Sequence, residues 1–205
     1  MTEMPEQLSR FGFSFESNGA HASRTMMLAE LEALLAYVDN PRAGKRDYLQ
    51  AIDEQNCLGK RSMKTRRLTY RHLTDLYSLD NTCILFQTLR NFWHCDIAVR
   101  PLLALLCAYA RDSIFLSTVP FLLKFPEGIK NTREALEEFF DRQEPDRFSA
   151  ATCKSMAQNI NPTWIKSGDL NGRVRKIRSR AHPSAGSVAY ALHLGYLVGS
   201  VVRCW

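Results

Sequence analysis

Apolar residues recur at intervals of three and four over most of this chain, which is the spacing of one face of an α-helix. Between residues 23 and 38, the positions that share such a face are Met27, Leu28, Leu31, Leu34, Leu35 and Val38. The same pattern predicts helices over about 23–38, 45–55, 62–77, 82–95, 101–112, 131–144, 149–160 and 184–202. We therefore expect an all-α protein.

Glycine, proline and capping residues indicate where these helices end. Residues 56–59 (Asn-Cys-Leu-Gly) are typical of a turn, because asparagine and glycine tolerate positive φ. Ser62 is a suitable N-cap for the helix that follows. A helix, a glycine-containing turn and a second helix form a layout like a helix-turn-helix motif. Asn161-Pro162 predicts the end of the 149–160 helix, because the residue before a proline avoids the helical region.

The N-terminal segment follows a different pattern. Phe11, Phe13 and Phe15 alternate, as in an extended segment that lays one aromatic face on the body. We expect an N-terminal arm over 1–20 and one helical domain over 21–205. Within that domain we expect a helix-turn-helix-like lobe over about 21–80 and a second lobe over about 81–205. The fold class is then a compact multi-helix bundle with helix-turn-helix-like elements and room for a minor β-ribbon.

The composition predicts a packed protein without metal or cofactor. Apolar residues make up 45% of the 205 residues, which is normal for a globular domain. The six cysteines contain no CxxC pair, so nothing predicts a zinc site. We expect reduced thiols and a cytoplasmic location. A basic segment followed by an apolar one, as in a secretion signal, is not found at the N-terminus.

Two apolar segments invite comparison with membrane spans. Residues 97–125 contain four charged side chains, which leave uncharged runs too short to cross a bilayer. Residues 183–202 are uncharged, but they mix tyrosine, serine, histidine and proline with apolar residues. We favour a buried C-terminal helix over a membrane span there, and we expect no membrane partner.

Positive charge is concentrated in two short stretches, residues 60–72 and 166–180. Together they hold 12 of the 27 Lys and Arg residues and one acid, a net +11, while the whole chain has a net charge of +6. The rest of the chain is therefore acidic on balance, and such clustering favours a polyanionic partner. The candidate nucleic-acid-binding residues are Lys60, Arg61, Lys64, Arg66, Arg67, Arg71, Lys166, Arg173, Arg175, Lys176, Arg178 and Arg180.

The two stretches predict two kinds of contact with nucleic acid. On the 62–77 helix, Lys64, Arg67 and Arg71 share one face, as in a helix that faces a groove of DNA. Residues 173–180 alternate cations with Val174 and Ile177, as in a ribbon that follows a phosphate backbone, and Gly168 and Gly172 allow a close backbone approach. A solvated cationic face and an acidic protein partner remain open alternatives for the helix, and an exposed hairpin that aids solubility remains open for the second stretch.

No sequence motif predicts catalysis. Arg111-Asp112 interrupts an apolar helix, so we expect Asp112 to form a partly buried pair or to cap neighbouring backbone. The helix over 131–144 opens with Asn131 and Glu134, in the manner of a capping box, and its acids are best explained as a solvated face. Trp164 fits either a core position or base stacking, with the core favoured. We therefore expect a protein that is not an enzyme, with a metal-dependent nuclease as a remote alternative.

Several strings together resemble the BrxA family of bacteriophage exclusion (BREX) defence systems. They cover about residues 20–200, and they are Asn-Cys-Leu-Gly-Lys at 56–60, Tyr-Ala-Arg-Asp at 109–112, Gln-Asn at 158–159, Trp164, Ser-Gly-Asp-Leu-Asn-Gly at 167–172, Lys176 and Leu-Gly-Tyr-Leu-Val-Gly at 194–199. Ile165 and Asp169 stand where the family prefers threonine and histidine.

The resemblance implies a small, helical, non-enzymatic defence component, similar to the RNA-binding antitermination factor NusB, with affinity for DNA. The expected partners are DNA, with RNA as a further possibility, and other components of the defence system. The leading alternative is a protein–protein adaptor whose basic faces dock acidic partners. The oligomeric state is left open.

Overall fold

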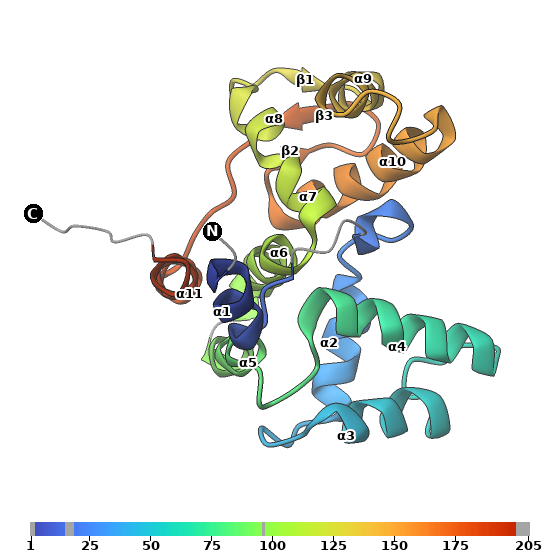
Figure 1. Ribbon diagram of the computed structural model, residues 1–205, viewed down its shortest axis with the longest axis vertical. Helices are drawn as coiled ribbons and strands as arrows, with labels where there is room; N and C mark the ends of the chain where they lie inside the picture. Colours follow the sequence, from blue (N-terminus) through green and yellow to red (C-terminus); the bar gives the residue numbers. More distant parts are fainter. Residues whose placement is uncertain (1–2, 15–18, 96, 200–205) are drawn as a thin grey trace, which may run out of the picture.

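The computed structural model describes residues 3–14, 19–95 and 97–199, and it is about 66% helical (Figure 1). The first part of the chain forms α1 (Glu3–Phe11), the 3-10 turn η1 (Ala20–Ala22), α2 (Leu28–Tyr37), α3 (Lys45–Leu49), the π-helical turn η2 (Gln50–Glu54) and α4 (Met63–Tyr77). The second part forms α5 (Ile84–Cys95), the 3-10 turn η3 (Ile97–Val99), α6 (Arg100–Arg111), α7 (Ser113–Ser117), α8 (Val119–Lys124), β1 (Lys130–Asn131), α9 (Arg133–Gln143), α10 (Ala150–Ser167), β2 (Leu170–Asn171), β3 (Lys176–Arg178) and α11 (Ala185–Leu197). The all-α fold class with a minor β element is confirmed.

Helix α6 lies in the middle of the molecule and packs against α4, α5, α10 and α11 (Figure 1). Its apolar face is fully buried at Leu103, Ala104, Cys107 and Ala108. Proline is tolerated near the start of this helix because the first N–H groups of a helix have no intrahelical acceptor. A helix buried on this scale depends on close packing, so the positions of its neighbours follow from it.

The predicted helix-turn-helix layout is present as α3, η2 and α4. Asn56 and Gly59 adopt positive φ of 50° and 62°, as the turn requires. The side-chain oxygen of Asn56 accepts the N–H of Lys60 at 2.8 Å, and Ser62 caps α4 by accepting the N–H of Thr65. The predicted turn at residues 56–59 and the predicted Ser62 cap are therefore confirmed.

The three short strands form one antiparallel sheet in the order β1-β3-β2. In its register, Lys130 lies opposite Ile177 and Leu170 lies opposite Arg178. Figure 1 shows this sheet beside α9 and α10, at the end of the long axis remote from α3 and α4. The β-ribbon expected in the second basic stretch thus exists, and it gains β1 as a third strand.

The expected extended N-terminal arm is wrong for the residues that the structure describes. Residues 3–11 form α1, and the chain after it buries Phe13. Leu8 is buried from α1 itself, so an amphipathic helical turn covers more apolar surface here than an extended strand does. Phe15 lies outside the described residues.

Three predicted helix ends also differ from the structure. Helix α2 begins at Leu28 rather than near Ser23, because Met27 has a left-handed φ of 49°. Thr132, not Asn131, caps α9, and Asn131 belongs to β1. The 149–160 helix does not end before Pro162: α10 continues to Ser167, since Thr163 and Trp164 beyond the proline are fully buried and their packing opposes the break.

The expected buried C-terminal helix is only partly correct. Tyr190 of α11 is buried and donates its hydroxyl to the Leu85 carbonyl, so one side of the helix packs on the body. The other side exposes Val188, Leu192 and Tyr196, the last to 79%. Among the residues that the structure describes, no element covers this side of α11.

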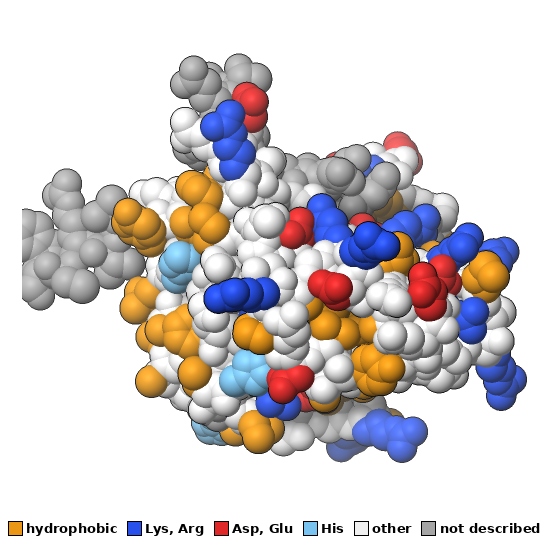
Figure 2. All heavy atoms as spheres, turned by 90° about the horizontal axis from the view of Figure 1, so that it is seen from below, with side chains coloured by type: hydrophobic (Ala, Val, Ile, Leu, Met, Phe, Trp, Pro, Cys, Tyr) orange, Lys and Arg blue, Asp and Glu red, His pale blue; other side chains and the backbone are white. Residues whose placement is uncertain are grey.

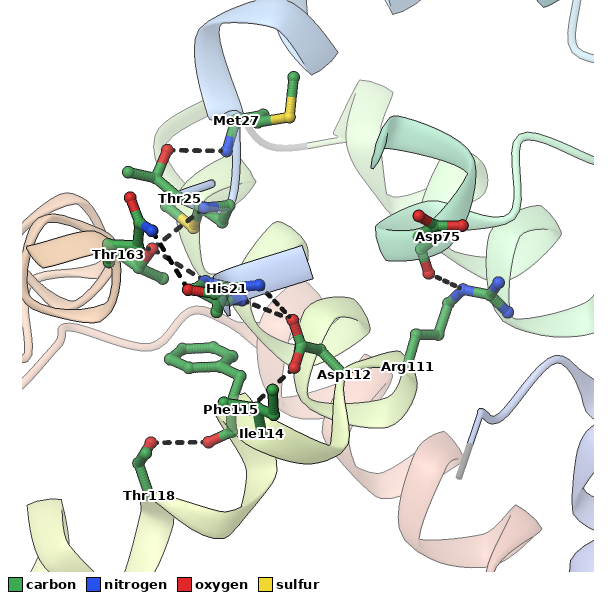
Figure 3. A network of polar contacts seen from close by, with 12 residues as sticks. His21, Thr25, Met27, Asp75, Arg111, Asp112, Ile114, Phe115, Thr118 and Thr163 are labelled. Atoms are coloured by element: carbon green, nitrogen blue, oxygen red, sulfur yellow. Dashed lines mark hydrogen bonds and ion pairs between the residues drawn. The ribbon is translucent and has the colours of Figure 1, made fainter. Parts of the chain in front are cut away.

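A buried ion pair joins three distant parts of the chain (Figure 3). His21 Nδ1 lies 2.8 Å from Asp112 Oδ2, and the two side chains are 0% and 1% exposed. The other nitrogen of His21 lies 3.1 Å from the Thr163 hydroxyl, so η1, the α6–α7 junction and α10 meet here. Asp112 also caps α7 by accepting the N–H of Phe115 at 2.9 Å. Asp112 thus forms the buried pair and the cap that the sequence indicated.

The surroundings of Asp112 set its pKa. Burial alone raises it, but the hydrogen bond and charge of His21 and two backbone N–H donors outweigh burial and lower the pKa of Asp112 below its usual value. The ionised carboxylate therefore stabilises the fold above the pKa of the unfolded chain, about 3.9. That stabilisation is lost as the pH falls through the lower pKa of the folded state.

We predict that Asp112→Asn lowers the free energy of unfolding by about 3 kcal/mol at neutral pH, because it removes one partner of a buried pair. The variant should also lose less stability than the unmodified protein between pH 5 and pH 2, since it no longer has this carboxylate to protonate. Urea unfolding across this pH range measures both effects. Asp141→Asn on the exposed face of α9 is the control and should change stability by less than about 0.5 kcal/mol. Equal loss in the two variants would contradict the role given to the pair.

Candidate nucleic-acid interface

Helix α4 carries the first basic stretch on its exposed side. Its buried side consists of Thr69, His72, Leu73, Leu76 and Tyr77, which fixes the direction of the remaining positions. No acidic residue lies in its first turn, so nothing within that turn balances the cations. The positive end of the helix dipole adds to the positive potential there.

Half of the cations predicted in this stretch have carboxylate partners. Lys60 lies 3.1 Å from Glu30, and Arg67 and Arg66 lie 3.0 Å and 3.8 Å from Asp53. Arg67 remains 66% exposed, so a phosphate can still approach it, whereas Arg66 and Lys60 are largely covered. Among the described ion pairs, Arg61, Lys64 and Arg71 have no carboxylate partner, and all three are exposed. We call these three residues the α4 surface.

Arg24 adds to the positive charge near the α4 surface, and the sequence reasoning missed it. His72 is buried on α4, and burial, followed by the charges of Arg24 and Arg71, lowers its pKa. Two cations near enough to disfavour a third positive charge indicate a locally positive potential. Only the fold brings Arg24 to this place, since it lies far from α4 in the sequence.

The second basic stretch forms the β2–β3 hairpin with its turn at residues 172–175. Gly172 has a φ of +91°, and a Cβ there would lie 2.1 Å from the Arg175 carbonyl oxygen, so the turn requires glycine. Arg173 and Arg175 are exposed on either side of Val174, which is 90% exposed. We call these three residues the hairpin tip.

The remaining cations of the second stretch have different surroundings. Arg178 is 12% exposed and donates to the Asp169 carbonyl oxygen at 2.9 Å, so the protein itself holds it. Arg180 is exposed but lies 3.2 Å from Glu127. Lys166 is exposed in the last turn of α10, and Lys176 is half-buried on β3. Arg178 is therefore a structural residue in this geometry, while Lys166 and the hairpin tip face solvent.

The two basic stretches do not form one continuous strip. Figure 1 shows α4 in one half of the molecule and the sheet at the opposite end, with α6 and α10 between them. Figure 2, which views the α3–α4 end, shows Lys and Arg side chains gathered on the side where α4 begins, with carboxylates among them. The sequence alone does not place the two stretches relative to each other, and the structure separates them into an α4 surface and a second basic surface around the hairpin tip.

Lys130 belongs to the surface around the hairpin and was not predicted. It lies opposite Ile177 in the sheet, and both side chains are exposed. Asn171 of β2 lies opposite Ile177 on its other side and is also exposed. The sequence around Lys130 gives no sign that it belongs to this basic surface, because α9 and α10 lie between β1 and β3 along the chain.

The carboxylate, imidazole and hydroxyl of Asp112, His21 and Thr163 are connected in the order of a hydrolase triad, but all three residues are at most 1% exposed. The Thr163 hydroxyl also accepts the N–H of Met26 and donates to the Asn159 carbonyl, so it is occupied by the fold. Glu138, one of the acids of the helix predicted over 131–144, is exposed on α9 and pairs with Arg142. Within the described ranges, no three His, Cys, Asp or Glu side chains lie close enough to hold a metal ion.

No protein-family model matches this chain, and no curated protein matches it. Within residues 3–14, 19–95 and 97–199, no single helix has the length and hydropathy of a membrane span. The length and hydropathy of a span are reached only when two helical segments are taken together, Ile97–Arg111 and Ser113–Lys124, and this pair is bent by 98°.

We predict that Gly172→Ala distorts the hairpin tip and lowers the free energy of unfolding by about 1–3 kcal/mol, because alanine at this φ is strained and its Cβ meets backbone. Thermal unfolding and amide exchange of residues 170–178 measure the effect. Gly195→Ala is the matched control: Gly195 lies within α11 with open space around it, so alanine should stabilise the helix by up to about 1 kcal/mol. An unchanged hairpin in Gly172→Ala would refute this account of the turn.

Proposed function

We propose that this protein is a non-enzymatic nucleic-acid-binding component of a bacterial BREX-type defence system, with double-stranded DNA as its ligand. The observation that supports this proposal best is the α4 surface, where Arg61, Lys64 and Arg71 are exposed without carboxylate partners among the described ion pairs. Surface cations kept free of acids are available to phosphates, and their binding releases counterions from DNA.

The hairpin tip provides a second point of contact at the other end of the molecule. Arg173 and Arg175 are exposed on a turn whose shape depends on Gly172. Two basic surfaces at opposite ends of the molecule suit a ligand that is long compared with the protein, as a duplex is. A small anion would need only one of them.

The strings that resemble BrxA lie at points that determine the fold. Tyr109 and Trp164 are joined by a hydrogen bond of 2.9 Å, Asp112 holds the buried pair with His21, and Gly168 ends α10 with a left-handed φ. The sequence resemblance therefore concerns the internal framework of the protein. It supports the defence role by family likeness, while the cations supply the physical argument for DNA.

We predict that binding to a DNA duplex weakens with salt with a slope of about −3 to −4 in log affinity against log salt, if about four cations engage phosphates. Reversing Arg61, Lys64 and Arg71 to glutamate should lower affinity at least about tenfold and make the slope shallower. The fold should tolerate the change, because glutamate is favourable near the start of α4 at positions 61 and 64, and Arg71 is exposed. Fluorescence anisotropy in a salt series measures it. The control reverses Arg42, Lys124 and Lys154, three exposed cations elsewhere, and should affect binding much less. Affinity that is flat in salt would overturn the proposal.

The adaptor remains the second candidate, and the exposed apolar side of α11 favours it, since such faces mark protein contacts. Reversing Arg173, Arg175 and Lys176 to glutamate separates the two functions. Under DNA binding, retention of a duplex in a gel shift should fall about tenfold or more. Under the adaptor function, duplex retention should stay unchanged and capture of partner proteins of the defence system should be lost instead.

A further inference from the structure

The hairpin tip exposes an apolar side chain between two arginines. Residues 171–175 are all exposed, and Val174, at 90%, is more exposed than any other large apolar side chain that the structure describes. Arg173 and Arg175 stand on either side of it, and neither belongs to an ion pair of the described residues. An apolar side chain so exposed adds nothing to the core, whereas a ligand that covers it gains the free energy of its burial.

Hydrogen bonds at the base of the hairpin hold the tip in one direction. The N–H of Ser179 donates to the Asp169 carbonyl at 3.0 Å, and the Ser179 hydroxyl donates to the Gly168 carbonyl at 2.8 Å. Arg178 also donates to the Asp169 carbonyl, at 2.9 Å. Together with the tight turn at Gly172, these contacts order the backbone before any ligand arrives, so binding costs little conformational entropy.

The strands behind the tip limit how the hairpin can meet a duplex. A free two-stranded ribbon can lie in the major groove of B-DNA, which is about 12 Å wide. Here β3 is the middle of three strands, and Figure 1 shows α9 and α10 beside the sheet. The sheet is therefore wider than the ribbon that this groove admits, and the tip with its side chains is the part that a groove can receive.

The minor groove suits such a tip, because it is about 6 Å wide and admits extended side chains but no helix or ribbon. Over A·T tracts this groove is narrow and its negative potential is enhanced, which attracts arginine. A guanidinium group is also more weakly hydrated than an ammonium group, so an arginine loses less when it leaves water.

The side chains of the tip can donate hydrogen bonds but cannot accept them. Arg173 and Arg175 have donors alone, and Val174 has no polar atom. The floor of the minor groove over A·T pairs presents only acceptors, which the arginines can satisfy. A G·C pair adds the 2-amino donor of guanine, which would stay without an acceptor beneath these three side chains. The chemistry of the tip therefore favours A·T pairs.

One carboxylate lies in the surroundings of the tip. Glu134 lines the same hollow as Val174 and Lys176, but it accepts from Arg133 at 2.9 Å. Lys130 and Arg133 line this hollow too, so three cations and one acid surround it. The local potential is therefore positive on balance and attracts the phosphates that border the groove.

We propose that the hairpin tip binds in the minor groove of A·T-rich DNA, where Arg173 and Arg175 donate to the acceptors on its floor and Val174 packs between its sugar walls. This inference rests on the proposed function and makes it more specific. The α4 surface binds phosphates of the same duplex, and the tip adds a preference for base composition. Duplex RNA is disfavoured, because its minor groove is wide and shallow.

The experiment measures fluorescence anisotropy with four duplexes of equal length: an A·T tract, a G·C tract, the same G·C tract with inosine in place of guanine, and an RNA duplex of A·U pairs. The A·T tract should bind about tenfold more tightly than the G·C tract and the RNA, which is within the discrimination that base contacts provide. Inosine lacks the 2-amino group but keeps the major-groove edge of guanine, so the inosine duplex should bind like the A·T tract.

Three variants test the side chains. Arg173→Lys with Arg175→Lys keeps both charges, so it should still bind duplexes but lose most of the A·T preference, because ammonium groups lose more hydration in the groove. Arg42→Lys with Arg46→Lys, two exposed arginines outside both basic stretches, is the matched control and should keep the preference. Val174→Thr adds a hydroxyl that can accept from guanine, so it should bring G·C binding closer to A·T binding. All these side chains are exposed, so thermal unfolding should not change.

The outcomes distinguish this inference from the function on which it rests. Equal binding of the A·T and G·C tracts, an inosine duplex that binds like the G·C tract, or RNA that binds as tightly as the A·T tract overturns the minor-groove site and leaves nucleic-acid binding intact. An A·T preference that persists in both the double lysine variant of the tip and Val174→Thr overturns it as well. Failure of the unmodified protein to bind any of the duplexes overturns the proposed function and this site with it.

Discussion

The buried pair of His21 and Asp112 is the interaction on which the arrangement of this fold depends. It joins a short turn near the N-terminus to the junction of α6 and α7, and Thr163 extends the contact to α10. A buried carboxylate is stable only when hydrogen bonds satisfy it, and here Asp112 accepts from the ring of His21 and from two backbone N–H groups. The pair therefore joins η1, the α6–α7 junction and α10, which together with the packing of α6 link the α4 end of the molecule to the sheet end.

The distance between the two basic stretches limits which ligands can contact both of them. With α4 at one end and the sheet at the other, no single phosphate group can meet both basic stretches (Figure 1). Each surface must act separately or share a long ligand, which is why the proposed ligand is a duplex and not a small anion. The structure also divides the cations by role: Arg178 supports the sheet, whereas Arg61, Lys64 and Arg71 remain open to solvent.

At Asn131 and Pro162 the structure departs from rules of local structure: Asn131 does not cap α9, and Pro162 does not end α10. Proline should end a helix, yet α10 continues because Thr163 and Trp164 pack beyond it. The fold thus keeps a proline inside a helix at the cost of one backbone hydrogen bond, and it buries the Asn131 Oδ1 without a hydrogen-bond partner.

The amino-acid sequence by itself determined most of the helices, the turn at residues 56–59, the Ser62 cap and the two clusters of cations. These features depend on residues within about one or two helical turns of each other, where periodicity and capping act directly. Only the tertiary structure decided which cations are paired, where Lys130 and Arg24 lie, and that His21 is the partner of Asp112. Those contacts join residues up to 91 positions apart, and burial, not local propensity, selects them.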